Sequence, residues 1–459
     1  MSCKQEKQFR SIFPNGTFFK PALDEIIFSE KIETFKIKSA IWKFYLTIFP
    51  RISSSAGVPE WSNIIKQNRL LYHKIQKRFI INSIEIKDHE LIGPLSQEDA
   101  KWNQYFEDEK QMNQIITDTN RLYQELDFFR DQENMKHINE IIFLHIRRFN
   151  IQYKQGYHEL CGIIYYLFKN EMKSTCIDYQ SDINDNFGYN FLFSKNPNDI
   201  DADVFWTYAN LVEYAKPFYQ VSNNPKKSPF CVQISQYIIG DLLKKYDPEL
   251  SKKINVGDCF ASVIPWTRLF FSRQFDLDDI PLLWTNIFTF FPNIDIICYI
   301  SISMIMSYKE KLLACHDENA VLMLLMNIHA DSPKEITSNG IQLFRNRNPA
   351  NKNKKKLTHL SEGMCFEIEK AIKDIQVVPK DKLIFQLKKF RDSLNLIIKS
   401  EKDEELLHIS DIDMLQSLPV TPSNDSEENK KKKSDFDVSP IIPPIYTIPE
   451  DSKDSNDIQ

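Results

Sequence analysis

Two short sequence patterns carry side chains that together could act on an anionic group and a water molecule. Ile115, Asp118 and Arg121 form the pattern IxxDxxR, and about thirty residues later Tyr-Lys-Gln-Gly at residues 153–156 forms YxQG. A guanidinium is planar, permanently charged and rich in donors, so an arginine can stabilise negative charge shared between oxygens. A carboxamide donates and accepts hydrogen bonds at once, so Gln155 can orient an attacking water. The residue types alone do not assign these roles to Arg121 and Gln155, because such short patterns also occur by chance.

Each of these residues also has an ordinary structural interpretation. Taken alone, Arg121 is typical of a solvated helix arginine and Gln155 of a surface-loop glutamine. Asp118 fits a helix acid that pairs with a nearby cation, a contact worth little at a surface. His158 beside Glu159 looks like a catalytic dyad, but a capping or packing role is the simpler interpretation. Only the order and spacing of the two patterns favour the reactive interpretation.

The elements that must hold these residues are predicted to be helices. The chain has 459 residues, of which 42% are hydrophobic and only 10 are glycine, so it can bury a sizeable core with few sharp turns. Apolar residues recur at helical spacing, and we therefore predict an all-α fold class. Three segments show this spacing clearly, the last of them as a deeply buried helix: Ile138, Ile141, Ile142, His145, Ile146 and Phe149; Ile280, Leu283, Trp284, Ile287 and Phe288; and Leu322, Leu324, Leu325 and Ile328.

The sequence around the two patterns resembles the TBC domain of Rab GTPase-activating proteins. Residues 94–129 read PLSQEDAKWNQYFEDEKQMNQIITDTNRLYQELDFF, and residues 153–160 read YKQGYHEL. These two segments are similar to the member 5 type of the family in particular. The resemblance runs from about residue 31 to residue 345, through DADVFWTYANLVEYAKPFY at 201–219 and IPWTRLFFSRQFDLDDIPLLWTNIF at 264–288. It implies a two-lobed helical TBC domain.

The resemblance also implies a mechanism. The family lends an arginine and a glutamine to a Rab GTPase in trans, so the chain would be an enzyme activator and not an enzyme. Arg121 would be the arginine finger and Gln155 the glutamine finger, both exposed on one face. The protein would need no cofactor of its own, because it would act on the GTP and Mg²⁺ bound to the Rab. Its partner would be a Rab family small GTPase in the GTP form.

Other residues of the family patterns would support the fingers or the core. By resemblance, Asp118 would hold the guanidinium or contact the GTPase, and Gly156 would let the backbone approach closely because it lacks a Cβ. The expected supporting and Rab-binding residues are Ile115, Asp118, Tyr153 and Gly156, and the expected structural residues are Lys38, Trp42, Trp102, Trp266 and Trp284. The family's usual residues are replaced at Leu122, Gln124, Tyr157, Lys38 and Thr285.

The composition divides the chain into five expected parts. The polar and basic residues after about 344 predict a linker, and the Ser, Asp, Lys and Pro content beyond about 410 predicts a disordered tail. The expected parts are an N-terminal extension at 1–30, the TBC domain at 31–344 with lobes at 31–239 and 240–344, a linker at 345–379, a helical segment at 380–409 and the tail at 410–459.

Several function classes receive little support from the sequence. The formal net charge of −5 does not suggest a nucleic-acid binder. Cys315 and His316 have no second pair beside them, so no metal site is predicted. The apolar stretch at 296–306 is too short to span a bilayer, which predicts a cytoplasmic protein that is at most peripheral on endosomal or other vesicle membranes.

Three hypotheses remain open. The first is an active Rab GTPase activator in endosomal trafficking or autophagy. The second is a catalytically slow TBC scaffold or adaptor, suggested by the replacements at Leu122, Gln124 and Tyr157. The third is an unrelated helical adaptor, in which Arg121 and Gln155 would lie far apart. The tail contains an apolar, proline-rich cluster at 441–446, for which two interpretations stay open: sparse apolar residues in a low-complexity end, or a short peptide that binds an endosomal coat or adaptor complex.

Overall fold

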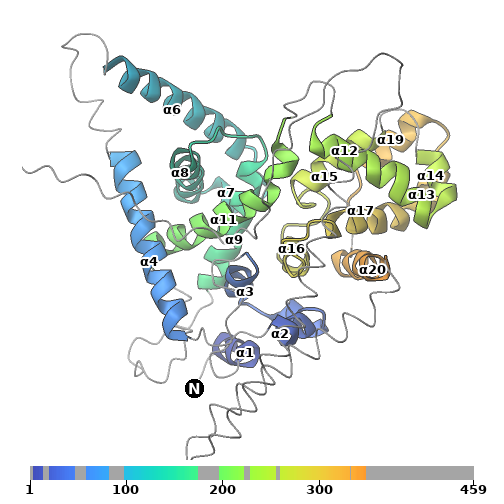
Figure 1. The fold of residues 1–459 in the computed structure, drawn as a ribbon, viewed down its shortest axis with the longest axis horizontal. Coiled ribbons are helices and arrows are strands. Elements are labelled where there is room, and N and C mark those ends of the chain that lie inside the picture. Colours follow the sequence, from blue (N-terminus) through green and yellow to red (C-terminus); the bar gives the residue numbers. More distant parts are fainter. Residues whose placement is uncertain are drawn as a thin grey trace, which may run out of the picture. The chain divides into compact units, whose positions relative to one another are not determined.

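Every regular element in the described part of the chain is a helix (Figure 1). The computed structural model describes residues 4–13, 20–46, 58–81, 98–173, 196–221, 228–254, 259–330 and 332–347. The all-α fold class predicted from the sequence is thus confirmed. The first helices are α1 (Lys4–Ile12), α2 (Lys20–Ile27), the 3₁₀ helix η2 (Glu30–Thr34), α3 (Lys38–Tyr45), α4 (Val58–Gln76) and the π-helical turn η3 (Lys77–Ile81).

The next helices carry both sequence patterns. Helix α8 is capped at its N-terminus by Asp131, whose carboxylate accepts from the Glu133 amide at 2.8 Å, and at its C-terminus by Asn150 in a left-handed conformation. Helix α9 packs against α8, α11, α6 and α3, so it lies at the centre of this group. The helices are α6 (Glu98–Thr119), α7 (Asp127–Arg130), α8 (Gln132–Phe149), α9 (Tyr157–Lys173) and α11 (Pro197–Tyr219).

The last part of the described chain is built from shorter helices, with α17 packed along α20 (Figure 1). The run from α12 through η4 to α13 is continuous, so the expected lobe boundary at 239/240 falls inside a helix, and the division into lobes stays a prediction. These elements are α12 (Phe230–Gln236), the π-helical η4 (Tyr237–Leu242), α13 (Leu243–Tyr246), α14 (Pro248–Ile254), η5 (Cys259–Val263), α15 (Ile264–Arg268), α16 (Ile280–Phe288), α17 (Ile296–Ser307), α18 (Lys309–Leu313), α19 (Glu318–Met326) and α20 (Pro333–Asn346).

Two of the three predicted helical faces lie in the core, and the third does so only in part. All five apolar residues predicted in α16 are buried, and in α8 all but Phe149 are. The prediction of a deeply buried helix at α19 is wrong, because Met323 and Met326 are 60% and 58% exposed. This helix is apolar on every side from residue 321 to 326, so periodicity did not show which side would pack. Only Val321 and Leu325 are buried within it.

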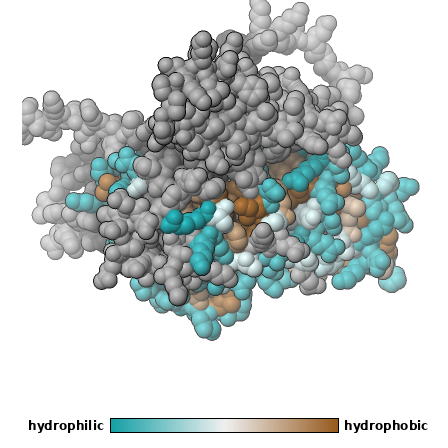
Figure 2. Space-filling model, turned by 90° about the horizontal axis from the view of Figure 1, so that it is seen from below, coloured by the Kyte–Doolittle hydropathy of each residue, from teal (hydrophilic) through white to brown (hydrophobic). Residues whose placement is uncertain are grey.

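Aromatic side chains hold the N-terminal helices to the rest of the fold. Phe13, from the expected N-terminal extension, lies 4.6 Å from the Phe44 ring and 5.7 Å from the Trp61 ring, measured between centroids. On the face in Figure 2 the described surface is mostly hydrophilic, with hydrophobic side chains gathered near its middle. None of the described helices is long and apolar enough to cross a membrane. The expected linker beyond residue 347, the helical segment at 380–409 and the tail at 410–459 lie outside the described residues.

Candidate functional site

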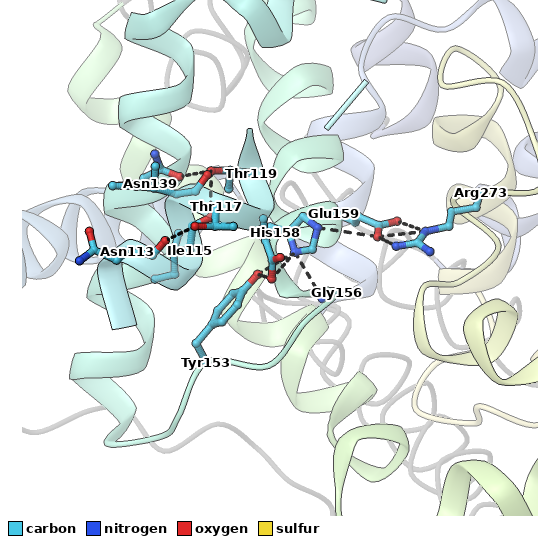
Figure 3. Close-up of polar contacts among 12 residues, drawn as sticks. Asn113, Ile115, Thr117, Thr119, Asn139, Tyr153, Gly156, His158, Glu159 and Arg273 are labelled. Carbon is cyan, nitrogen blue, oxygen red and sulfur yellow. Dashed lines mark hydrogen bonds and ion pairs between the residues drawn. The ribbon is translucent and has the colours of Figure 1, made fainter. Parts of the chain in front are cut away.

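Arg121 lies two residues after Thr119, the last residue of α6, and its side chain is exposed. That end of the helix is fixed from inside. Ile115 is fully buried, and the buried Thr119 hydroxyl lies 2.7 Å from Asn139 Oδ1 of α8 (Figure 3). Ile115 therefore supports the site from the core, and its burial leaves no surface for contact with a partner.

The segment after Arg121 is anchored at two consecutive residues. Leu122 is buried, and a Cβ on Gly162 of α9 would lie 2.9 Å from its Cδ1, so the two segments pack closely. Tyr123 has a positive φ of 32° and donates its hydroxyl hydrogen to the Ser272 carbonyl at 3.2 Å. The Gln124 carboxamide donates back to the main-chain carbonyl at the end of α6. Leu122 and Gln124, which replace the family's usual residues, thus both have defined partners.

Gln155 lies in the connection between α8 and α9, and its side chain is exposed as expected. The next residue, Gly156, has φ of +107°, which side chains rarely allow. A Cβ there would lie 2.7 Å from the Tyr219 hydroxyl and 2.8 Å from Leu269 Cδ2. This position requires glycine for both its conformation and its close approach, and that fixes the path of the main chain beside Gln155.

Three buried side chains join the two patterns, and we call Asp118, Tyr153 and His158 the clamp. The Tyr153 hydroxyl lies 2.9 Å from Asp118 Oδ2 and 2.7 Å from His158 Nδ1 (Figure 3). Burial and the hydrogen bond to Asp118 raise the pKa of Tyr153 above its usual range, so its hydroxyl stays protonated. The clamp ties α6, one turn before Arg121, to the loop that carries Gln155.

The Asp118 carboxylate contacts the other two residues of the clamp. Tyr153 occupies its Oδ2 oxygen, and His158 Nδ1 lies 3.9 Å away. Asp118 was expected to hold the Arg121 guanidinium, but no ion pair between these two residues is among the contacts of the described residues. Asp118 is only 8% exposed, so its place is beneath the site.

A second layer of contacts connects the clamp to the segment before α16. Glu159 of α9 is buried, and its carboxylate accepts from Arg273 Nε and from the Ser272 hydroxyl, each at 3.1 Å (Figure 3). His158 Nε2 lies 3.8 Å from Glu159 Oε1. Burial lowers the pKa of His158 below its ordinary value, although Glu159 and Asp118 act in the opposite direction. Sequence reasoning missed Arg273 and Ser272, because they lie more than a hundred residues from Glu159 and no local pattern pairs them.

The expected structural residues lie in the core. Trp42, Trp266 and Trp284 are at most 1% exposed, and the Trp42 indole donates to Thr285 Oγ1 at 2.8 Å. Thr285, one of the replaced positions, thus accepts a buried hydrogen bond. The Lys38 amide donates to Glu171 of α9 at 2.7 Å, which caps α3 from the helix that follows Gln155. Trp102 lies in α6, but its side chain is outside the described residues.

The arrangement sets two exposed polar groups on a buried, hydrogen-bonded support. A charged guanidinium and a neutral carboxamide stand on segments that the clamp joins. Such a pair suits the stabilisation of developing negative charge and the orientation of water. The groups face solvent, so their target must come from outside the chain.

Comparison with known proteins agrees with the sequence patterns. A family model described as the Rab-GTPase-TBC domain matches residues 61–313, more than half of the 459 residues. TBC1 domain family member 5 of Mus musculus and of Homo sapiens are each 23% identical over 347 residues, covering 70% of this chain but only 41% and 42% of those proteins. The chain thus spans less than half the length of these relatives. The crystal structure of the Ypt/Rab-GAP domain of Gyp1p aligns with a TM-score of 0.55 at 15% identity, covering 74% of this chain and 97% of that one, which shows a shared fold.

Proposed function

The chain belongs to the Rab-GTPase-TBC domain family, and from that premise we propose that it activates a Rab GTPase by supplying Arg121 and Gln155 in trans. It is an activator and contributes side chains to a site whose GTP and Mg²⁺ are held by the Rab. The observation that carries the proposal is the clamp. It joins two segments that are more than thirty residues apart in the sequence, and each segment presents one exposed candidate group.

The chemistry of GTP hydrolysis explains why these two residue types belong together. Negative charge spreads over the γ-phosphoryl oxygens as the bond to the leaving group breaks. The Arg121 guanidinium supplies several donors and a fixed positive charge to those oxygens. The Gln155 carboxamide accepts from the attacking water and donates to the phosphoryl group, which orients the water for in-line attack. Both residues act only when the Rab brings its phosphate to them.

The rigid support matters because positioning is most of the catalysis. Phosphoryl transfer asks the protein for placement and electrostatic stabilisation and for little covalent chemistry. The Leu122 packing and the Tyr123 hydrogen bond fix the main chain directly after Arg121. These contacts favour an active protein over the slow scaffold that the replacements at Leu122, Gln124 and Tyr157 suggest.

For the cellular role, we propose peripheral action on endosomal or other vesicle membranes in trafficking or autophagy. The support is the similarity to relatives named TBC1 domain family member 5. We further propose that the tail at 410–459 recruits the domain to an endosomal coat or adaptor complex. Deleting residues 410–459 should leave hydrolysis in solution intact and disperse the protein from membranes in cells; unchanged membrane targeting would contradict this role.

The test of the proposed function is GTP turnover by a panel of purified, GTP-loaded Rab GTPases, with and without the full chain. At least one Rab should be stimulated, and Arg121→Ala should remove about 10³-fold or more of that stimulation. Arg121→Lys should not restore it, because an ammonium lacks the planar fork. Arg10→Ala, at an exposed arginine of α1, is the matched control and should keep full activity. Turnover that is stimulated without Arg121 would contradict the mechanism; binding without any stimulation would favour the scaffold.

A further inference from the structure

The first turn of α9 holds a buried imidazole that has two hydrogen-bond contacts with the YxQG loop. His158 is 5% exposed, and its Nδ1 lies 3.3 Å from the Gly156 amide nitrogen and 2.7 Å from the Tyr153 hydroxyl (Figure 3). A main-chain N–H can only donate, so Nδ1 accepts in its contact with the Gly156 amide, and the one hydrogen of the Tyr153 hydroxyl then serves either Nδ1 or Asp118 Oδ2. In this state the ring is neutral and carries its hydrogen on Nε2, the nitrogen that faces Glu159.

The Gly156 amide belongs to the peptide plane that it shares with Gln155. Glycine loses more conformational freedom on ordering than any other residue, so a loop at Gly156 needs an external restraint. The hydrogen bond to His158 supplies one, because it fixes the orientation of the plane from which the Gln155 side chain departs. The Tyr153 hydroxyl then connects the same imidazole to Asp118, one turn before Arg121.

We propose that His158 is a positioning residue for Gln155, acting by accepting the Gly156 amide hydrogen and so holding the glutamine loop in register with Arg121. The inference rests on the proposed function and extends it to a residue that touches neither the GTP nor the Rab. His158 is buried beneath the loop, and its effect passes through Gly156.

Burial is what favours the accepting form of the ring. Burial lowers the pKa of His158 below its ordinary value; Glu159 and Asp118 act in the opposite direction, and Arg273 and Arg121 add to the lowering. If the ring gains a proton, Nδ1 becomes a donor and can no longer accept from Gly156. The hydrogen bond from the Gly156 amide is therefore fully formed when the pH is above the pKa of His158. It is lost as the pH falls through that pKa. The charged and titratable groups that face the ring are Asp118 and Arg121 from the end of α6, Tyr153 from the loop, Glu159 from α9 and Arg273 from the segment before α16.

The test compares three substitutions of the same residue. In His158→Asn the side-chain oxygen reaches about the place of Nδ1 and can still accept from Gly156. In His158→Gln the amide reaches further, towards the place of Nε2, and His158→Leu has no acceptor. The probe is the Rab that the wild-type chain stimulates most strongly in the panel, assayed at saturating concentration. His158→Asn should stay within a few-fold of wild-type kcat, whereas His158→Leu and His158→Gln should lose about 10- to 100-fold in kcat with little change in KM.

Two further readouts separate positioning from general stability. Amide hydrogen exchange at Gly156 should accelerate in His158→Leu and His158→Gln but not in His158→Asn, with or without a Rab. In the wild type kcat should fall as the pH is lowered, whereas in His158→Asn it should be flat over the same range after correction for intrinsic hydrolysis. If His158→Leu does not fold, the Asn and Gln pair still decides the question.

The outcomes distinguish this inference from the proposed function. Equal kcat and equal Gly156 exchange in the Asn and Gln variants would overturn the role of His158 and leave Arg121 and Gln155 untouched. Loss of the activity in all three variants, with wild-type Gly156 exchange, would also overturn it. If the wild-type chain stimulates no Rab, the proposed function fails and the role of His158 in it fails too, while the exchange data still show whether the imidazole holds the loop.

Discussion

Replacing Gly156 with alanine should both destabilise the protein and remove its activity. The main-chain φ of +107° costs a non-glycine residue about 1–3 kcal/mol. The new Cβ would also lie 2.7 Å from the Tyr219 hydroxyl and 2.8 Å from Leu269 Cδ2, both well inside contact distance. Relieving such overpacking costs about 1–3 kcal/mol more, so Gly156→Ala should lower the free energy of unfolding by about 2–6 kcal/mol.

The matched control is the same substitution at Gly240, in the helical run from α12 to α13. A Cβ there would meet nothing within 4 Å, so alanine should stabilise the helix by roughly 0.5–1 kcal/mol. Urea unfolding followed by tryptophan fluorescence measures both variants, because Trp42, Trp266 and Trp284 are buried. The two midpoints should move in opposite directions. A Gly156→Ala variant as stable and as active as the wild type would refute the reasoning about this loop.

Two further predictions concern one contact before α8 and one made by α8 itself. Tyr123→Phe removes only the hydroxyl that donates to the Ser272 carbonyl, so the free energy of unfolding should fall by about 0.5–1.5 kcal/mol and stimulated GTP turnover should fall too. Urea unfolding and the Rab assay measure these two effects. Wild-type values in both would show that this hydrogen bond contributes nothing. The hydrogen bond to Asp201 at 2.6 Å raises the pKa of His137, so its stabilisation is complete below the unfolded pKa of 6.5 and is lost as the pH rises through the folded value. The urea midpoint should fall less between about pH 5.5 and pH 8 in His137→Gln than in the wild type, and parallel curves would contradict this.

The helices and the two exposed groups of the site could be predicted from the sequence because their signals are local. Spacing gave the buried face of α8, and the order of the two patterns gave Arg121 and Gln155. Local spacing did not reveal which side of α19 packs, since apolar residues surround that helix and only the tertiary structure leaves Met323 exposed. The same limit hid the Arg273 contact with Glu159, because these residues meet only after the chain folds.

The contacts of His158 could not be predicted from the sequence for a related reason. A histidine two residues after a loop glycine predicts capping or packing, and the imidazole does pack. The sequence does not say that its Nδ1 accepts from the Gly156 amide or that Tyr153 bridges it to Asp118. These contacts depend on the distance between α6 and the loop, which α8 and α9 set by their packing.

The central claim is that Arg121 and Gln155 act together on one phosphoryl group, and a double-mutant cycle tests it most directly. Single-turnover GTP hydrolysis by the stimulated Rab would be measured with the wild type, Arg121→Ala, Gln155→Ala and the double variant. Each single variant should lose most of the stimulation, and the double variant should be no slower than the slower single one, since residues that act as a unit are not additive. Losses that multiply independently, or a Gln155→Ala variant with wild-type turnover, would contradict the account.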